Sequence, residues 1–239
     1  MKKDLIKSIV AFSLLGTMLA GCQEKVDTPV KNTSSDSEST ESTEHSHNHS
    51  HVHSHDDEKK QEIYSGIFQD DEVEDRELSD WEGDWQSLYP FLLDGILDEV
   101  LHKKVETNKD KTFEEYKDYY KVGYETDIER IVIKDNTITF YKNGEGKTGE
   151  YKYHGYKILT YESGNRGVRY LFDLVEEVNG VPKHVQFSDH SIYPTKSEHY
   201  HIYFGGEEHD TLLNELENWP TYYPSNLSGK EIVEEMNAH

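Results

Sequence analysis

The residues best suited to metal chemistry are three histidines near the C-terminal end of the chain, His190, His199 and His201. Along a β-strand, side chains two positions apart project from the same face, so His199 and His201 form a pair. The turn signal at residues 193–196, which contains Pro194, predicts a hairpin that brings His190 back beside this pair. Three neutral imidazoles on two adjacent strands suit a borderline ion such as Zn²⁺.

Two other interpretations of these histidines stay open. Histidines two positions apart on an exposed strand are often only solvated polar residues, and three histidines with a water are also the ligand set of a zinc-dependent hydrolase. We expect the flanking Asp189 and Glu198 to orient the imidazoles or to be solvated. The sequence contains no nucleophile elbow, Walker loop or His-Glu-x-x-His helix, so we predict that the protein is not an enzyme.

A second group of histidines lies in a polar segment, residues 23–62, that has almost no large apolar residue. Such a segment buries too little apolar surface to offset the entropy of ordering, so we predict a disordered, acidic tether over residues 22–62. Histidine-rich tracts in mobile chains wrap around metal ions, which predicts auxiliary metal capture here. An affinity tag or a pH-sensitive solubilising tail is the alternative. The six histidines occupy every second position: His45, His47, His49, His51, His53 and His55.

The first 21 residues have the layout of a secretory signal, with a basic start, a short apolar run and small residues at the end. The order Leu19-Ala20-Gly21-Cys22 resembles a bacterial lipobox, which implies cleavage before Cys22 and lipid attachment to it. Cys22 is the only cysteine of the chain. We therefore expect a protein anchored by lipid to the extracytoplasmic face of the cell membrane. The alternative is an ordinary signal followed by a coincidental cysteine.

The formal net charge of −23 over 239 residues restricts the partners. Such a charge repels nucleic acid and anionic membrane surfaces, and it raises the local concentration of cations. We therefore predict no nucleic-acid partner, and contact with the membrane only through the lipid anchor. The length allows one domain with additional segments, or at most two small domains, and we place one domain at residues 63–239.

The hydrophobic pattern of this domain predicts helices followed by a meander of strands. A helix is expected over residues 89–105, and a capping box at Thr112 opens a second through about Lys121. From Asp127 the pattern changes to about seven short strands joined mostly by tight turns, which the Trp85 segment would close into a small antiparallel barrel. We expect helices over residues 211–217 and from the cap Ser228 to Met236, with residues 219–224 as a rigid aromatic connector. The seven strands are expected at residues 128–133, 137–141, 149–153, 156–161, 168–174, 184–187 and 199–204.

The domain resembles the ZinT/YodA family of bacterial extracytoplasmic zinc-binding proteins. The resemblance covers roughly residues 63–239. It rests on several long motifs, among them Leu78-Ser79-Asp80-Trp81-Glu82-Gly83-Asp84-Trp85, Gly167-Val168-Arg169-Tyr170-Leu171-Phe172, Gln186-Phe187-Ser188-Asp189-His190, His199-Tyr200-His201 and Trp219-Pro220-Thr221-Tyr222-Tyr223-Pro224.

The resemblance implies a mainly β, calycin-like or lipocalin-like antiparallel barrel with additional α-helices. It implies a zinc site at one mouth, formed by His190, His199 and His201, with a fourth position filled by an N-terminal histidine, water or an anion. It also implies zinc capture under scarcity, binding of cadmium, and delivery toward an ABC-type zinc uptake system. A lipocalin-like carrier of a small apolar ligand is the alternative from another class.

Overall fold

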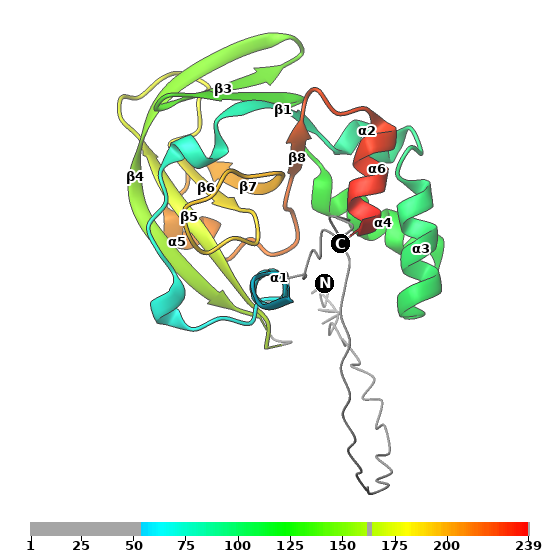
Figure 1. Ribbon diagram of the computed structural model, residues 1–239. Coiled ribbons are helices and arrows are strands. Elements are labelled where there is room, and N and C mark those ends of the chain that lie inside the picture. The colour runs from blue at the N-terminus through cyan, green and yellow to red at the C-terminus, as the bar shows by residue number, and fades with distance from the viewer. Residues whose placement is uncertain (1–53, 162–163, 239) are drawn as a thin grey trace, which may run out of the picture.

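The computed structural model describes residues 54–161 and 164–238. Its centre is a closed barrel of eight antiparallel strands, in which each strand pairs with the next and the last pairs with the first (Figure 1). The predicted fold class, an antiparallel lipocalin-like barrel with helices, is confirmed. The strands are β1 (Gly83–Ser87), β2 (Arg130–Lys134), β3 (Thr137–Lys142), β4 (Glu145–Thr160), β5 (Arg166–Leu174), β6 (His184–Ser188), β7 (Tyr200–Gly205) and β8 (Thr221–Pro224).

Large aromatic side chains fill the interior of the barrel. Trp81 is fully buried, and its ring stacks on Phe187 with a centroid distance of 5.0 Å. Phe172 packs edge-on against both rings, at 5.9 and 5.7 Å. Tyr200 of β7 continues this cluster, because its ring meets Phe187 at 5.1 Å and Trp85 of β1 at 4.8 Å. The barrel is therefore a packed scaffold, and its strands alternate core residues with residues that face outward.

Two predictions about the strands are wrong. The segments expected at residues 149–153 and 156–161 belong to one long strand, β4, because a bulge between Tyr153 and Gly155 absorbs the expected turn. Gly155 takes a φ of +133°, which a glycine adopts without strain. The expected connector at residues 219–224 contains strand β8, which pairs with β1 and β7 and closes the barrel.

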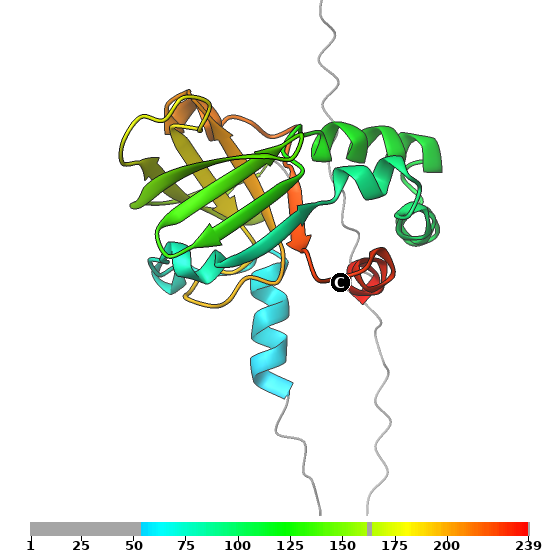
Figure 2. The same ribbon diagram turned by 90° about the horizontal axis from the view of Figure 1, so that it is seen from above.

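A helical lobe lies beside the barrel and has its own apolar core, built around Leu88, Leu92, Leu101 and Ile232. Figure 2 shows this lobe separated from the barrel strands, with β8 between the two. The predicted capping box of α4 is confirmed by reciprocal bonds between Thr112 and Glu115. The lobe contains α2 (Tyr89–Leu93), α3 (Asp98–Asn108), α4 (Phe113–Tyr124) and α6 (Gly229–Ala238).

Three helices differ from the expected boundaries. The helix expected over residues 89–105 is divided into α2 and α3, because Gly95 between them has a φ of +77°. The helix expected over residues 211–217 is the single turn α5 (His209–Leu212). A further helix, α1 (Ser54–Tyr64), was not expected: most of it lies in the range predicted for the tether, and its last two residues lie in the predicted domain. Figure 2 shows α1 side-on, projecting from the barrel. Two short 3-10 helices, Asp70–Glu72 and Leu78–Trp81, follow α1.

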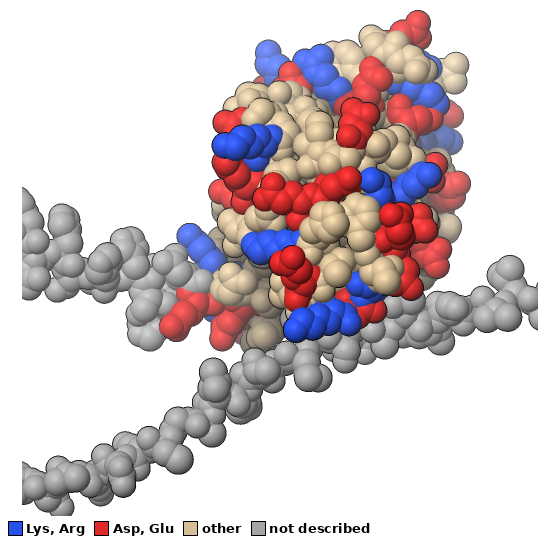
Figure 3. All heavy atoms as spheres, turned by 90° about the vertical axis from the view of Figure 1, so that its right-hand side faces the viewer, with Lys and Arg blue, Asp and Glu red and all other residues tan. Residues whose placement is uncertain are grey.

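Acidic and basic side chains are intermixed on the face that Figure 3 shows. No continuous surface of one sign covers that face, so the acidic excess of the chain does not form a single field there. Among the helices of residues 54–161 and 164–238, none combines the length and the apolar composition that a bilayer span requires.

Candidate metal centre

The three histidines singled out in the sequence come together beside the end of β7. His201 lies on this strand between Tyr200 and Ile202, whose side chains are in the barrel core, so its imidazole faces outward. His199 directly precedes the strand, and His190 follows the end of β6, which pairs with β7. One nitrogen from each of the three rings lies within 4.8 Å of one nitrogen from each of the others.

The spacing of two of these nitrogens matches a metal ion. The Nε2 atoms of His190 and His201 are 3.3 Å apart. Two nitrogens bound to one tetrahedral Zn²⁺ at about 2.0–2.1 Å are separated by about 3.3 Å. The rings of His199 and His201 are 6.1 Å apart between centroids, and those of His190 and His199 are 5.8 Å apart, so all three face a common point.

A hydrogen-bond chain sets the protonation of His201. Its Nδ1 lies 2.7 Å from the Thr221 hydroxyl, and that hydroxyl donates to the carbonyl of Trp219 at 3.0 Å. Because the hydroxyl hydrogen goes to Trp219, its oxygen accepts, and Nδ1 of His201 carries the proton. The Nε2 lone pair of His201 therefore points toward His190 and is available for a cation.

Aromatic rings hold the other two imidazoles in place. Tyr64 of α1 stacks on His190 at 4.4 Å, and Tyr223 of β8 stacks nearly parallel on His199 at 5.0 Å. Ser197 donates from its hydroxyl to the carbonyl of His199 at 2.8 Å, which fixes the approach to β7. Of these partners, Tyr223 and Thr221 lie in a motif quoted above, whereas nothing in the sequence indicated Tyr64.

A buried ion pair organises the loop that carries the histidines. Arg76 is 1% exposed and donates to both carboxylate oxygens of Asp189, at 2.6 and 3.0 Å. The same guanidinium donates to the carbonyl of Thr195 at 2.8 Å and to Asp80 at 2.7 Å, and it stacks over the Trp81 ring at 4.1 Å. Residues 189–199 contain no helix or strand. The bonds of Arg76 connect Asp189, at the start of this segment, to Thr195 in its second half.

Asp189 therefore orients the site through the backbone. Its neighbour His190 has a left-handed φ of +63°, a conformation that is uncommon outside glycine but that histidine, asparagine and aspartate adopt more often than other residues. The N–H of Ser191 donates to Oδ1 of Asp189 at 3.3 Å, so the carboxylate that Arg76 binds also contacts the backbone on the other side of His190. Glu198, the other flanking carboxylate, is exposed.

The site opens into two cavities of about 530 and 410 Å³. Both are lined by Tyr64 and His190, one also by His201 and the other by His199. Burial lowers the pKa of the His201 imidazole well below its usual range, and the neighbouring His190, His199 and Arg169, whose positive charge would repel a proton on His201, lower it further. His201 is therefore neutral at pH 7, the state in which an imidazole binds a metal.

Residues 59–239 match the family described as ZinT (YodA) periplasmic lipocalin-like zinc-recruitment. The chain belongs to the ZinT family. Proteins of this family recruit zinc and are not enzymes. The chain is 53% identical over 182 residues to the probable metal-binding protein YrpE of Bacillus subtilis, covering 76% of this chain and 72% of YrpE.

The zinc-binding lipoprotein AdcA of Streptococcus pneumoniae is also 53% identical over 182 residues, but the ZinT-like chain spans only 36% of AdcA. The crystal structure of the Zn(II)-bound ZinT-like domain of Streptococcus pneumoniae AdcA superposes with a TM-score of 0.71. The superposition covers 73% of this chain and 97% of that domain, and the sequence identity is 53%. The similarity therefore extends over nearly all of the separate ZinT-like domain.

The remaining sites predicted from the sequence of this ZinT protein lie outside the described residues. The signal sequence, Cys22 and the histidines from His45 to His53 fall within residues 1–53. His55 lies in α1, at a position where the side chain is not described. Their lipid attachment and metal capture therefore stay predictions.

We predict that Asp189→Ala strongly destabilises this ZinT protein. The substitution removes the carboxylate that accepts two bonds from the buried Arg76 guanidinium and leaves Asp80 as its remaining ionic partner. Loss of a partner from a buried pair lowers the free energy of unfolding by up to about 3–5 kcal/mol. Urea unfolding of the metal-free chain measures the loss. The matched control is Asp84→Ala, which breaks an exposed pair with Arg130 and should change the free energy by about 0–1 kcal/mol. Equal effects of the two variants would contradict the bracing role of Asp189.

We predict that metal-free protein loses stability through His201 as the pH falls below 6.5. Unfolded His201 takes up a proton near its ordinary pKa of about 6.5, while the folded imidazole stays neutral, so protons favour the unfolded state. Between pH 7.5 and 5.5 the wild type should lose about 1 kcal/mol more unfolding free energy than His201→Asn. Chemical denaturation at both pH values measures the difference, and equal losses would show that His201 titrates normally.

Proposed function

We propose that this protein captures Zn²⁺ outside the cell through His190, His199 and His201. The observation that carries the proposal is the separation of 3.3 Å between the Nε2 atoms of His190 and His201, which fits two ligands of one tetrahedral ion. The Nδ1–H of His201 is held by Thr221, so the facing nitrogen is already free of its proton. The Zn(II)-bound structure of the related AdcA domain supports the same metal.

The arrangement supports reversible capture of an ion. Three neutral imidazoles leave the fourth position of a tetrahedral ion for a small ligand, and the two cavities at Tyr64 and His190 provide access to it. A softer ion of the same charge, Cd²⁺, fits the same nitrogen ligands. The acidic chain raises the local concentration of either cation.

Two other functions have less support. A carrier of a small apolar ligand needs an empty barrel, whereas Trp81, Phe172 and Phe187 pack against one another inside this one. A zinc hydrolase needs a general base beside the metal. The flanking carboxylate of Asp189 is bound on both oxygens by Arg76, so it is not available as that base.

We predict that removing any one of the three ligands lowers the affinity for zinc at least about 100-fold, since even residues that only orient metal ligands change it by about 10–100-fold. The variants are His199→Ala, His201→Ala and His190→Asn. Asparagine is chosen at position 190 because it tolerates the left-handed φ of +63°. Competition titration of metal-free protein against a zinc chelator measures the affinity.

The matched control is His102→Gln on α3, whose exposed ring stacks on Phe113 away from the site. It removes one imidazole and should leave the tightest affinity unchanged. Tight binding that persists in the three ligand variants would discard this site.

We also propose that the mature chain is held at the extracytoplasmic face of the membrane by lipid on Cys22, and that it delivers zinc toward an ABC-type uptake system. The lipobox-like order ending at Cys22 and the lipoprotein name of the AdcA relative support the anchor. The zinc-recruitment role of the family supports delivery.

We predict that Cys22→Ser releases the protein from the membrane fraction and lowers zinc accumulation by zinc-starved cells. Lipid on Cys22 is the proposed attachment, and several acyl chains on one cysteine hold a protein at a membrane surface. Fractionation and radioactive zinc uptake measure the two effects, with His102→Gln as the control. If the variant stays in the membrane fraction, the anchor is wrong. If it is released and uptake is unchanged, delivery from the membrane is wrong.

A further inference from the structure

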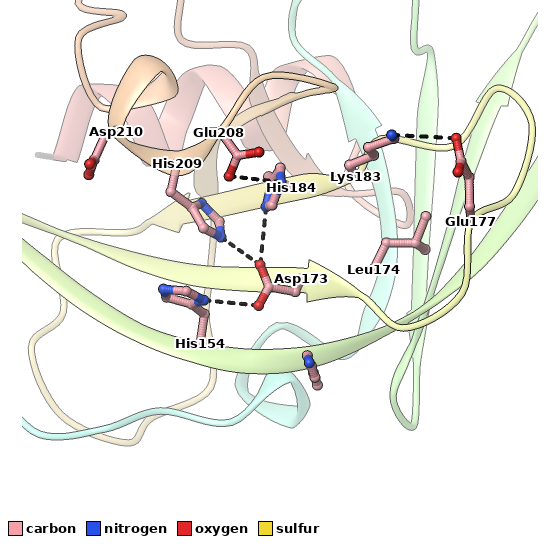
Figure 4. A pocket seen from close by; sticks show the side chains of 10 residues that line it. His154, Asp173, Leu174, Glu177, Lys183, His184, Glu208, His209 and Asp210 are labelled. Carbon is pink, nitrogen blue, oxygen red and sulfur yellow. Dashed lines mark hydrogen bonds and ion pairs between the residues drawn. The ribbon is translucent and has the colours of Figure 1, made fainter.

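A second cluster of metal-binding side chains lies at the other end of the strands that carry the first. His184 is the first residue of β6, and His190 lies beyond the other end of that strand. In the same way, His209 follows β7 and His199 precedes it. At this second end Asp173 of β5 lies at the centre of three imidazoles, as Figure 4 shows. The two clusters are therefore separated by the length of the β6–β7 hairpin.

The imidazoles converge closely on the Asp173 carboxylate. His154 approaches Oδ2 through Nδ1 at 2.9 Å, while His184 Nδ1 and His209 Nε2 both lie 3.1 Å from Oδ1 (Figure 4). One ligand atom each of His154, Asp173 and His209 lies within 4.8 Å of the other two. The rings of His184 and His209 are 4.5 Å apart between centroids, so a further imidazole stands beside these three.

The fold brings these residues together from four elements. Asp173 and His184 are direct cross-strand partners on β5 and β6, and both face outward from the barrel. The bulge in β4 lies at His154, next to Asp173. His209 begins α5, and the Gln186 amide donates to its carbonyl at 3.1 Å. The cluster is thus built on paired strands and an anchored turn.

We propose that Asp173, His154 and His209, with His184 beside them, form a second site for a divalent ion of the Zn²⁺ class. Two imidazoles and a carboxylate are an established type of zinc ligand set, and they suit this ion better than Mg²⁺ or Ca²⁺, which prefer oxygen. The site lies in a pocket of about 650 Å³, which gives an ion access from solvent. Three acidic residues and two lysines also line it: Glu177, Glu208, Asp210, Lys152 and Lys183.

The hydrogen bonds of the cluster indicate how an ion enters. The ring nitrogens that face Asp173 serve as donors to its carboxylate in the metal-free protein, so an ion takes the place of their protons. In His184 the proton then moves to Nε2, which lies 3.9 Å from a carboxylate oxygen of Glu208. This gives the carboxylate–imidazole–metal arrangement common in zinc sites.

From the same hydrogen bonds we expect the second site to bind Zn²⁺ more weakly than the first. The Gln186 amide nitrogen lies 3.2 Å from Nδ1 of His209, which keeps the proton of this ring on Nε2, facing Asp173. Ligation through Nε2 moves this proton to Nδ1, and the amide of Gln186 must then turn to accept it. At the first site, the Nε2 atom of His201 already lacks a proton.

Crystals of the full mature chain, soaked in increasing concentrations of Zn²⁺, test the second site directly. Anomalous diffraction at the zinc edge should show one peak among His190, His199 and His201, then a second between Asp173, His154 and His209 at higher zinc. The soaks should extend to about 100 times the zinc concentration that fills the first site completely. If only the first peak appears at that concentration, the second site is overturned. The unmodified protein is used, so the test does not depend on how a variant folds.

Equilibrium dialysis of the full mature chain against defined free Zn²⁺ provides the matched test in solution. Asp173→Asn and His209→Gln should each bind one equivalent fewer than the wild type, and His102→Gln should bind the same number. His201→Ala should lose the tight equivalent and keep the weaker one, so failure of the two sites is distinguishable. An unchanged number in both Asp173→Asn and His209→Gln would overturn the proposal.

Discussion

The metal centre depends on one buried ion pair, between Arg76 and Asp189. Residues 189–199 contain no regular element, so backbone pairing does not hold them in one conformation. The Arg76 guanidinium supplies that order by binding Asp189 near one end of the segment and the Thr195 carbonyl near the other. An uncompensated charge at this depth would be strongly unfavourable, which makes the pair sensitive to loss of either member. His190, whose backbone is left-handed, directly follows Asp189 in this segment.

The barrel acts as a scaffold with a filled interior. Because side chains alternate along each strand, every core residue such as Tyr200 or Phe187 is followed by a residue that faces outward. Asp173, His184 and His201 occupy such outward positions on β5, β6 and β7. The other candidate ligands lie at the ends of these strands or beside them, where Tyr64 of α1 and Tyr223 of β8 contact His190 and His199 at one end and α5 supplies His209 at the other. Both candidate metal sites therefore lie outside the packed interior of this lipocalin-like fold, and that interior gives the barrel wall rigidity.

The two histidine clusters differ in how far they are prepared for an ion. In the first, a hydroxyl fixes the His201 tautomer with a free nitrogen facing the site, and aromatic rings cover His190 and His199. In the second, a carboxylate accepts the protons of the facing nitrogens, so these protons must move before an ion binds. Preorganisation is a matter of proton placement as much as of distance, and the neighbours of each imidazole decide it.

The sequence by itself determined the features that depend on local spacing. The pattern of strands and turns predicted the barrel, the capping box predicted the start of α4, and the His-x-His spacing with a turn at Pro194 predicted which three histidines meet. The errors of the sequence-based prediction also come from its reliance on local spacing. The bulge at Gly155 and the pairing of β8 depend on distant strands, so local pattern placed a turn and a connector there. Only the tertiary structure decided that Arg76, 113 positions away, holds Asp189, and that Asp173 gathers histidines from three other elements. Such contacts join residues far apart in the chain, and no local periodicity encodes them.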